Sequence, residues 1–122
     1  MKFKEQKSIY EQIIDRVCDE LMTDVYPEGE RIISVREYAA NIQVNPNTVM
    51  RAYDWLQSEN IITLQRGVGY FVCKGAKRRI LRKAREEFAR EYLPDLANRL
   101  SVLGISPEEL SEQLKPLMHS PH

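Results

Sequence analysis

Residues 34–72, SVREYAANIQVNPNTVMRAYDWLQSENIITLQRGVGYFV, decide the fold. Ser34 followed by Glu37 is a capping box, in which each side chain can hydrogen-bond the backbone N–H of the other residue at the start of a helix. The apolar residues after this box recur at the spacing found on the buried face of a helix. The sequence therefore predicts a short helix over residues 34–42.

A second helix is expected after a tight connection at residues 43–44. Asn45 offers a side-chain oxygen as N-cap, and Pro46 takes the first helical position, where its missing N–H costs nothing. The positions that must face inward share helical spacing and are apolar: Val49, Ala52, Tyr53 and Leu56. The positions left on the outer face are mostly polar: Asn47, Met50, Arg51 and Asp54.

A β-hairpin and an earlier helix complete this part of the chain. Two β-prone runs, residues 61–65 and 70–73, flank a short segment whose glycines permit the positive φ angles of a hairpin tip. Upstream, Ser8 and Glu11 form another capping box that opens an apolar stripe of helical period, which predicts a helix over residues 8–24. The expected order is therefore helix, helix, helix, hairpin.

Length and composition exclude several classes of protein. The chain has 122 residues and a mass of 14.3 kDa, which suits one small domain with an appendage and excludes a large two-domain enzyme. Its 18 basic residues balance 18 acidic ones, so any binding to nucleic acid must depend on local charge placement. The N-terminal segment lacks an apolar signal core, and no apolar run is long enough to cross a membrane. We therefore expect a cytoplasmic protein that does not bind membranes.

Residue types that catalyse reactions or hold metals are not gathered into a recognisable motif. The sequence has no phosphate-cradling loop, no nucleophile with a basic partner, and no paired carboxylates in a pocket-building context. Cys18 and Cys73 stand far apart in apolar settings, which is typical of reduced core cysteines. His119 and His122 lack carboxylate or thiol companions. We therefore expect no enzymatic activity, no metal site and no cofactor.

Two short helices joined by a three-residue turn, with the second capped and polar outside, are the arrangement that inserts a helix into the DNA major groove. Asn47 can offer its amide to an adenine edge, and Arg51, one turn on, can reach guanine or a phosphate. Arg36 can hold a phosphate, and Arg66 at the hairpin tip can enter the minor groove. Near the N-terminus of this helix, two further side chains can hydrogen-bond oxygens of the DNA backbone: Asn45 and Thr48.

Residues 8–73 resemble the winged helix-turn-helix of the GntR family of bacterial transcription regulators. The motifs that carry the resemblance stand in family order and spacing: SIYEQIIDRV, SVRE, NTV, RAY, Leu56 and the wing RGVGYFV. The resemblance implies a winged helix-turn-helix that binds double-stranded DNA. The DNA-binding residues predicted from it and from the spacing are Ser34, Arg36, Asn45, Pro46, Asn47, Thr48, Arg51, Arg66 and Gly67.

The chain departs from the common family pattern near the turn. Where the family commonly has proline, glycine and arginine, this chain has Ile33, Gln43 and Pro46. A left-handed conformation at Gln43 would cost roughly 1 to 2 kcal/mol relative to glycine, so a strained or slightly rebuilt turn is expected. Pro46 and Met50 also replace long polar or basic side chains of many relatives, so the operator sequence cannot be copied from them. The Asn-Pro-Asn-Thr-Val and Arg-Ala-Tyr motifs are similar to those of the YtrA-like branch, which has a short C-terminal part.

The segment after the hairpin is strongly basic. Residues 74–85, KGAKRRILRKAR, hold seven basic residues and no acidic one. Such a run can clamp phosphates beside the wing, or it can form a solvated helix face with Arg82–Glu86 and Lys83–Glu87 pairs. The sequence leaves both interpretations open.

The C-terminal part has the pattern of a dimerisation device. An apolar stripe of helical spacing runs over residues 77–103 and is interrupted by Pro94, which predicts one long, kinked helix. Gly104 ends this helix, and Ser106 begins a second helix with its own apolar edge. A piece of about forty residues is too small for a core of its own, so a second copy of the chain is the expected partner. The predicted dimer interface consists of Leu81, Ala84, Phe88, Tyr92, Leu96 and Leu100.

These patterns predict a mainly α fold with a small β-hairpin. Residues 1–75 are expected to form a winged helix-turn-helix DNA-binding domain, residues 76–118 a two-helix dimerisation domain, and residues 119–122 a flexible tail. The expected function is that of a homodimeric regulator that binds a palindromic operator and represses a transporter operon or a neighbouring operon. The sequence neither requires nor excludes a small-molecule effector, for example at Phe88 and Tyr92. Two alternative functions remain, a winged-helix protein-interaction module and an architectural DNA binder without sequence preference.

Overall fold

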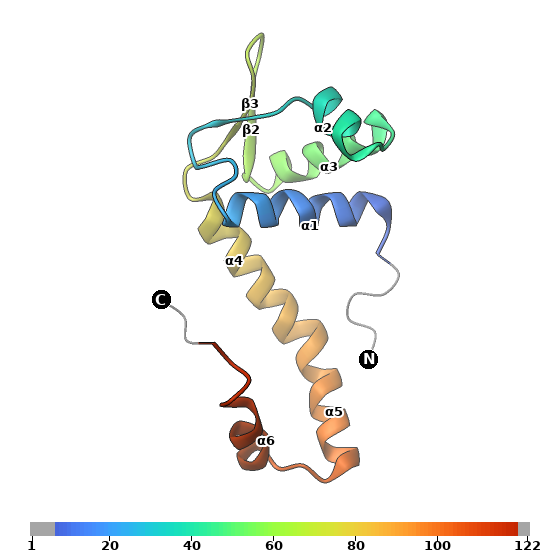
Figure 1. Ribbon diagram of the computed structural model, residues 1–122, viewed down its shortest axis with the longest axis vertical. Coiled ribbons are helices and arrows are strands. Elements are labelled where there is room, and N and C mark those ends of the chain that lie inside the picture. Colours follow the sequence, from blue (N-terminus) through green and yellow to red (C-terminus); the bar gives the residue numbers. More distant parts are fainter. Residues whose placement is uncertain (1–6, 120–122) are drawn as a thin grey trace. The chain divides into compact units, whose positions relative to one another are not determined.

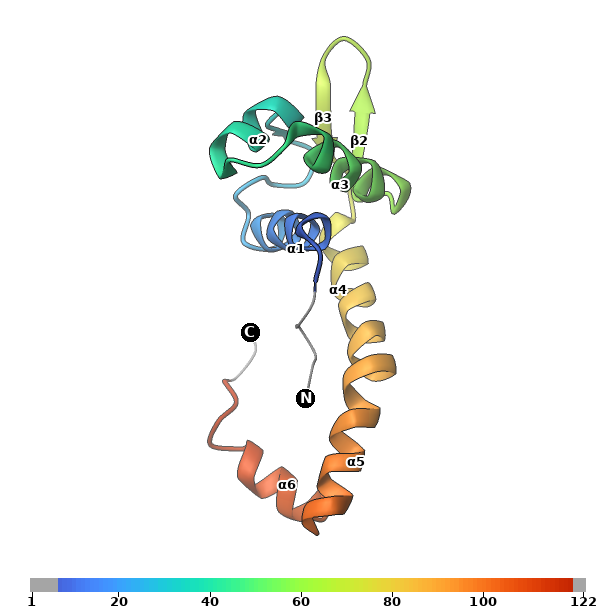
Figure 2. The same ribbon diagram turned by 90° about the vertical axis from the view of Figure 1, so that its right-hand side faces the viewer.

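The computed structural model describes residues 7–119 (Figures 1 and 2). Its elements, in chain order, are α1 (Ile9–Met22), β1 (Arg31–Ile32), α2 (Val35–Ile42), α3 (Pro46–Ser58), β2 (Ile62–Gln65), β3 (Gly69–Val72), α4 (Ala76–Glu87), the π-helical segment η1 (Phe88–Tyr92), α5 (Leu93–Leu103) and α6 (Pro107–Leu114). The chain is mainly helical with a small antiparallel sheet, which confirms the predicted fold class. Within the predicted tail, residues 120–122 lie outside the described part of the chain.

The chain divides within α4, between Ala84 and Arg85, into two compact units. We call the described residues 7–84 the N-terminal unit and residues 85–119 the C-terminal unit. The N-terminal unit contains α1 to α3, the sheet and most of α4, and the C-terminal unit contains the end of α4 and all later helices.

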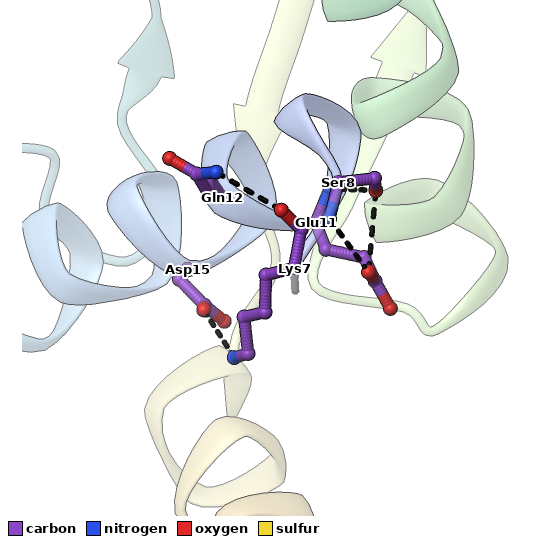
Figure 3. Close-up of polar contacts among 5 residues, drawn as sticks. All are labelled: Lys7, Ser8, Glu11, Gln12 and Asp15. Carbon is purple, nitrogen blue, oxygen red and sulfur yellow. Dashed lines mark hydrogen bonds and ion pairs between the residues drawn. The ribbon is translucent and has the colours of Figure 1, made fainter. Parts of the chain in front are cut away.

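The predicted capping box opens α1 (Figure 3). The N–H of Glu11 donates to Ser8 Oγ at 3.1 Å, and the N–H of Ser8 donates to Glu11 Oε1 at 3.0 Å. Two further contacts join Lys7 to the start of α1. The Gln12 side-chain amide donates to the Lys7 carbonyl at 3.0 Å, and the Lys7 side chain forms an ion pair with Asp15. The two hydrogen bonds of the capping box satisfy backbone N–H groups that have no partner within the helix, and they fix where α1 begins.

The turn between α2 and α3 keeps its left-handed residue although no glycine stands there. Gln43 ends α2 with φ at 57°, and its N–H donates to the Ala39 carbonyl. The N–H of Val44 also donates to that carbonyl, at 3.0 Å. Asn45 then caps α3, because its Oδ1 accepts the N–H of Asn47 at 2.8 Å. The two helices are therefore joined as tightly as the sequence predicted, at the cost of a non-glycine left-handed residue.

A third strand, which the sequence analysis did not predict, joins the hairpin. β1 pairs antiparallel with β3, so the sheet order is β1-β3-β2. Arg31 lies opposite Phe71, and Ile32 lies opposite Tyr70. A strand of two residues is too short to show an alternating pattern in the sequence, and its pairing depends on contacts with residues far along the chain. The hairpin itself, β2 with β3, is confirmed.

The core of the N-terminal unit lies between α1, α2, α3 and the sheet. Tyr53 is fully buried, and its hydroxyl donates to the Ile33 carbonyl at 2.7 Å. The rings of Tyr38 and Tyr70 meet the Tyr53 ring edge-on, with centroids at 6.1 and 5.0 Å. The four inward positions predicted for α3 are all fully buried: Val49, Ala52, Tyr53 and Leu56.

The first two turns of α4 are attached to the N-terminal unit. Ala76 is buried in the core, and Ile80 packs against it. The Glu28 carboxylate accepts the N–H of Gly75 at 2.9 Å and the N–H of Lys77 at 3.0 Å, so a side chain distant in sequence caps the helix. These two hydrogen bonds lower the pKa of Glu28 below its usual value. The start of α4 therefore belongs to the fold of this unit.

Within the C-terminal unit, a π-helical segment precedes Pro94. The N–H of Leu93 donates to the Phe88 carbonyl five residues earlier, which is the spacing of a π-helix. A proline in a helix lacks the N–H and clashes with the carbonyl four residues before it, and a wider turn relieves this clash. Gly104 then ends α5 with φ at 70°, and Ser106 caps α6 by accepting the N–H of Glu109 at 3.1 Å. The predicted ends of these helices are confirmed.

Candidate nucleic-acid-binding surface

The outer face of α3 is open to solvent. Asn47, Met50, Arg51 and Asp54 are all exposed, as the helical spacing predicted. In both ribbon views, α2 and the tip of the β2–β3 hairpin lie on one side of α3, and α1 lies on the other side (Figures 1 and 2). The α3 helix therefore lies between α1 and the tip of the hairpin.

Arg51 is held by an aromatic ring of α1. Its guanidinium carbon lies 4.4 Å from the centre of the Tyr10 ring, within the range of a cation–π contact. Tyr10 was not among the predicted site residues. The contact restricts Arg51 to the side of the outer face of α3 that is next to α1, so that part of its side-chain entropy is lost before any ligand binds.

The N-terminus of α3 carries the next group of predicted residues. Asn45 uses its Oδ1 to accept the N–H of Asn47, so that its amide N–H groups are the part available to an external acceptor. Pro46 occupies the first turn and is exposed, and Thr48 is half-buried beside it. The first N–H groups of a helix and its dipole together favour a phosphate at this end.

Two predicted residues lie at the start of α2 and have different roles in the fold. Arg36 is exposed in the first turn of α2. Ser34 is the N-cap, and its Oγ accepts the N–H of Glu37 at 3.1 Å. The Ser34 hydroxyl in turn donates to Glu37 Oε1 at 3.3 Å, so its proton and one lone pair of its oxygen are both used by the cap.

The tip of the wing, the β2–β3 hairpin, is exposed. Arg66 and Gly67 lie in the turn between the strands, and the N–H of Val68 donates to the Gln65 carbonyl at 2.9 Å. Gly67 has φ at 79°, a conformation that favours glycine. Arg66 therefore lies in a short turn that a backbone hydrogen bond closes.

Arg31 is a further cation beside the wing that sequence analysis missed. It lies on β1, and its guanidinium covers Gly69 at the start of β3. A Cβ at Gly69 would lie 2.7 Å from Arg31 Nε, so the arginine occupies space that only a glycine leaves open. In the sequence, Arg31 is only a basic residue directly before an apolar one. This pattern does not place the residue beside the wing unless the strand pairing is known.

Gly69→Ala is expected to lower the free energy of unfolding by about 1 to 3 kcal/mol, because it strains a backbone with φ at 145° and displaces the Arg31 side chain. Urea unfolding measures this loss. In an Arg31→Ala background no arginine side chain is displaced, so Gly69→Ala should lower the free energy of unfolding by less there than in the wild type. Equal losses in the two backgrounds would contradict the packing of Arg31 on Gly69.

Part of the basic run is used by the N-terminal unit itself. Lys77 pairs with Asp24 at 2.6 Å, and Arg79 donates to the carbonyls of Asn60 and Lys74, each at 2.9 Å. Lys83 pairs with Glu59 at 2.9 Å, and not with Glu87 as in the solvated-face interpretation, and it also lies over the Trp55 ring. The remaining basic side chains of the run are exposed: Lys74, Arg78, Arg82 and Arg85.

The described residues contain no group of three or more His, Cys, Asp or Glu side chains that could hold a metal ion. Cys18 and Cys73 are both free thiols and half-buried. Burial, with the nearby Asp15 and Asp19 carboxylates, raises the pKa of the Cys18 thiol to about 12, so this thiol is protonated at neutral pH. None of the helices between residues 7 and 119 is both long and apolar enough to span a membrane.

The C-terminal unit leaves its apolar stripe uncovered. Between residues 85 and 119 no side chain is fully buried. Phe88 is 49% exposed and Leu117 is 72% exposed, values that are unusual for large apolar side chains in a closed core. Of the predicted interface, Leu81, Ala84 and Phe88 are exposed, and Tyr92, Leu96 and Leu100 are half-buried. The rings of Phe88 and Tyr92 meet edge-on, with centroids 5.9 Å apart.

The chain is similar to known proteins over almost its whole length. Residues 9–72 match the family model described as bacterial regulatory proteins, gntR family. The HTH-type transcriptional regulator YhcF of Bacillus subtilis is 32% identical over 93% of this chain and 93% of its own length. The HTH-type transcriptional repressor YtrA of Bacillus subtilis is 34% identical over 89% of this chain and 83% of its own length.

Solved structures agree with this assignment. A putative transcriptional regulator of the GntR family from Bacteroides thetaiotaomicron has 45% sequence identity and a TM-score of 0.83, covering 89% of this chain and 96% of that chain. BusR of Streptococcus agalactiae, solved in complex with its busAB-promotor DNA, has the same fold at 21% identity and a TM-score of 0.62, covering 91% of this chain and 53% of its own. The chain therefore belongs to the GntR family and is a DNA-binding transcriptional regulator with a winged helix-turn-helix, not an enzyme.

Proposed function

We propose that the protein is a homodimeric repressor that binds a palindromic operator through the outer face of α3. The observation that carries this proposal is the exposure of Asn47 and Arg51 on a capped helix whose opposite face forms the core of the unit. A helix anchored in this way presents fixed polar groups to the major groove. The relative named as a transcriptional repressor supports repression, and the BusR complex supports promoter DNA as the ligand.

Each predicted residue has a proposed role on the duplex. Asn47 contacts an adenine edge, and Arg51 contacts guanine or the adjacent phosphate after leaving the Tyr10 ring. The phosphate contacts come from Arg36 and, at the α3 N-terminus, from Asn45 and Thr48. Arg66, on the wing, enters the minor groove. Ser34, Pro46 and Gly67 shape these elements, and their backbone approaches the DNA.

Two copies of the chain are proposed to pair through the apolar stripe that begins at Leu81 on α4 and continues to Leu100 on α5. The interface consists of Leu81, Ala84, Phe88, Tyr92, Leu96 and Leu100. Two-fold symmetry then places two recognition helices about 34 to 36 Å apart, or a multiple of this distance, which matches one turn of DNA. A palindromic operator follows from this symmetry.

The family resemblance further supports a transporter operon or a neighbouring operon as the target. A regulator that binds the bacterial chromosome acts in the cytoplasm, so the proposal also places the protein there. In terms of domains, we propose that residues 1–75 bind DNA and that residues 76–118 dimerise.

Arg51→Ala is expected to weaken binding to the operator by about 10- to 100-fold while leaving binding to random duplex almost unchanged, because one base contact is lost. Arg36→Ala should weaken both duplexes alike and reduce the slope of log K against log salt by about 1, because one phosphate contact is lost. Fluorescence anisotropy across a salt series measures both effects.

Arg16→Ala is the matched control, because Arg16 is an exposed arginine of α1 that pairs with Glu20 at 3.6 Å and is not among the proposed DNA contacts. Its affinity should equal that of the wild type. Absence of any duplex binding at low salt would favour the protein-interaction module. Equal affinity of the wild type for operator and random duplex would favour the architectural binder.

A further inference from the structure

Met50 does not fit the polar character of the recognition face. It is 42% exposed on the outer side of α3, in the first turns of the helix. Asn47 and Asp54, three residues before and four after it, share its side of the helix and are exposed too. A large apolar side chain thus stands in the row of side chains that the proposed function assigns to the bases.

The wing holds Met50 in place. The Tyr70 hydroxyl donates to Met50 Sδ at 3.9 Å, a long contact acceptable for sulfur. Tyr70 is itself fixed, because its ring meets the buried Tyr53 ring edge-on at 5.0 Å. Leu64 lies opposite Tyr70 in the register of β2 and β3, and it is exposed as well. Leu64 and Tyr70 therefore lie on the same face of the hairpin, and the Tyr70 hydroxyl joins this face to Met50 of α3.

In the major groove the apolar group on a base edge is the C5 methyl of thymine. Methionine is flexible and polarisable and suits contact with a methyl group. We infer that Met50 contacts a thymine methyl in each operator half-site, with Tyr70 positioning its sulfur. This inference rests on the proposed function. Met50 and Asn47 are separated by about 4.5 Å along the helix axis, so the thymine lies roughly one base-pair step from the base that Asn47 contacts.

Deoxyuridine tests the inference, because it differs from thymidine only in the C5 methyl and keeps every hydrogen-bonding group. An operator is first obtained by selection from random duplexes, and each thymine of a half-site is then replaced in turn by deoxyuridine. At one position per half-site, the wild type should bind about three- to fivefold more weakly, the effect of one buried methyl. Replacement in both half-sites should multiply the two losses.

Met50→Ala should bind the thymine and deoxyuridine operators equally at that position, because the contacting side chain is gone. Met50→Leu is the matched control, and it should keep a preference for thymine because it still presents an apolar side chain. Thermal unfolding verifies that both variants fold, which the exposed location of Met50 favours. Tyr70→Phe should reduce the preference without abolishing it, because it removes only the hydroxyl that holds the sulfur.

Several outcomes would overturn the inference. One is a wild type that binds every deoxyuridine duplex as tightly as the original, even if Met50→Ala weakens binding, since Met50 would then serve packing alone. Another is a selected operator without thymine in its half-sites. Binding to no duplex at all would instead refute the proposed function, so the two failures are distinguishable.

Discussion

Leu100→Asp is expected to convert the protein from dimer to monomer and to weaken operator binding by about 10²- to 10⁴-fold. Leu100 lies on α5 in the apolar stripe of a unit in which no described residue is fully buried. Burial of a carboxylate in an apolar interface has a desolvation cost that exceeds the free energy gained when the two chains associate. Loss of the dimer removes the second half-site contact, and the gain from bivalent binding is lost with it. Analytical ultracentrifugation and anisotropy with the operator measure the two effects.

Asn98→Asp is the matched control for this prediction. Asn98 lies on the same helix, two residues away and therefore on nearly the opposite side, and it is exposed. It introduces the same charge but should leave the dimer and the operator affinity unchanged. Circular dichroism verifies that both variants keep their helices. A dimeric, tightly binding Leu100→Asp protein would place the dimer interface elsewhere.

Leu56→Ala is expected to lower the free energy of unfolding by about 2 to 5 kcal/mol. Leu56 is fully buried on the inner face of α3, where α1, α2 and the sheet meet. The loss combines the transfer free energy of the removed groups with the cavity that remains, because a packed core closes only partly around it. For a small domain this is a large fraction of the total stability. Urea unfolding followed by circular dichroism measures it.

Met50→Ala provides the comparison within the same helix. Met50 carries a side chain of similar size but is exposed, so its truncation should change the free energy of unfolding by less than about 0.5 kcal/mol. The two variants together separate the role of α3 in the core from its role at the surface. Equal losses would mean that the two faces of α3 are assigned wrongly.

The helices could be predicted because their signals are local. Each signal acts within about one turn of the chain, and in the structure the helices begin or end at these residues. They are the capping boxes at Ser8 and Ser34, the N-cap Asn45 and the C-cap Gly104. The buried positions of α3 followed from helical periodicity for the same reason. The exposed outer face of α3 was thereby predicted as well.

The contacts that sequence analysis missed join residues distant along the chain. Pairing of Arg31 with Phe71 creates β1 and brings a cation to the wing, and the cap of α4 comes from Glu28. Tyr10 lies forty-one residues before Arg51, whose guanidinium it holds. No local pattern encodes such pairs, because each residue is ordinary in its own segment and acquires its role only from the packing of the fold.

The basic run and the interruption of the helix before Pro94 were predicted only in outline. The charge count of residues 74–85 gave no indication that Lys77, Arg79 and Lys83 are used by the N-terminal unit. Pro94 predicted a disturbance in the helix, but the π-helical form that the chain adopts before it depends on how the backbone relaxes. The sequence therefore showed where both features lie, but not which contacts or backbone conformation they have.

Selection of bound sequences from a pool of random duplexes, followed by the stoichiometry of the purified complex, tests the central claim most directly. We expect a palindromic consensus whose half-sites are spaced by about one turn of DNA or a multiple of it and are occupied by two chains. Loss of that consensus on replacing Asn47 and Arg51 by alanine would link it to the exposed face of α3. A single chain bound to an asymmetric site, or a consensus unaffected by these substitutions, would contradict the account.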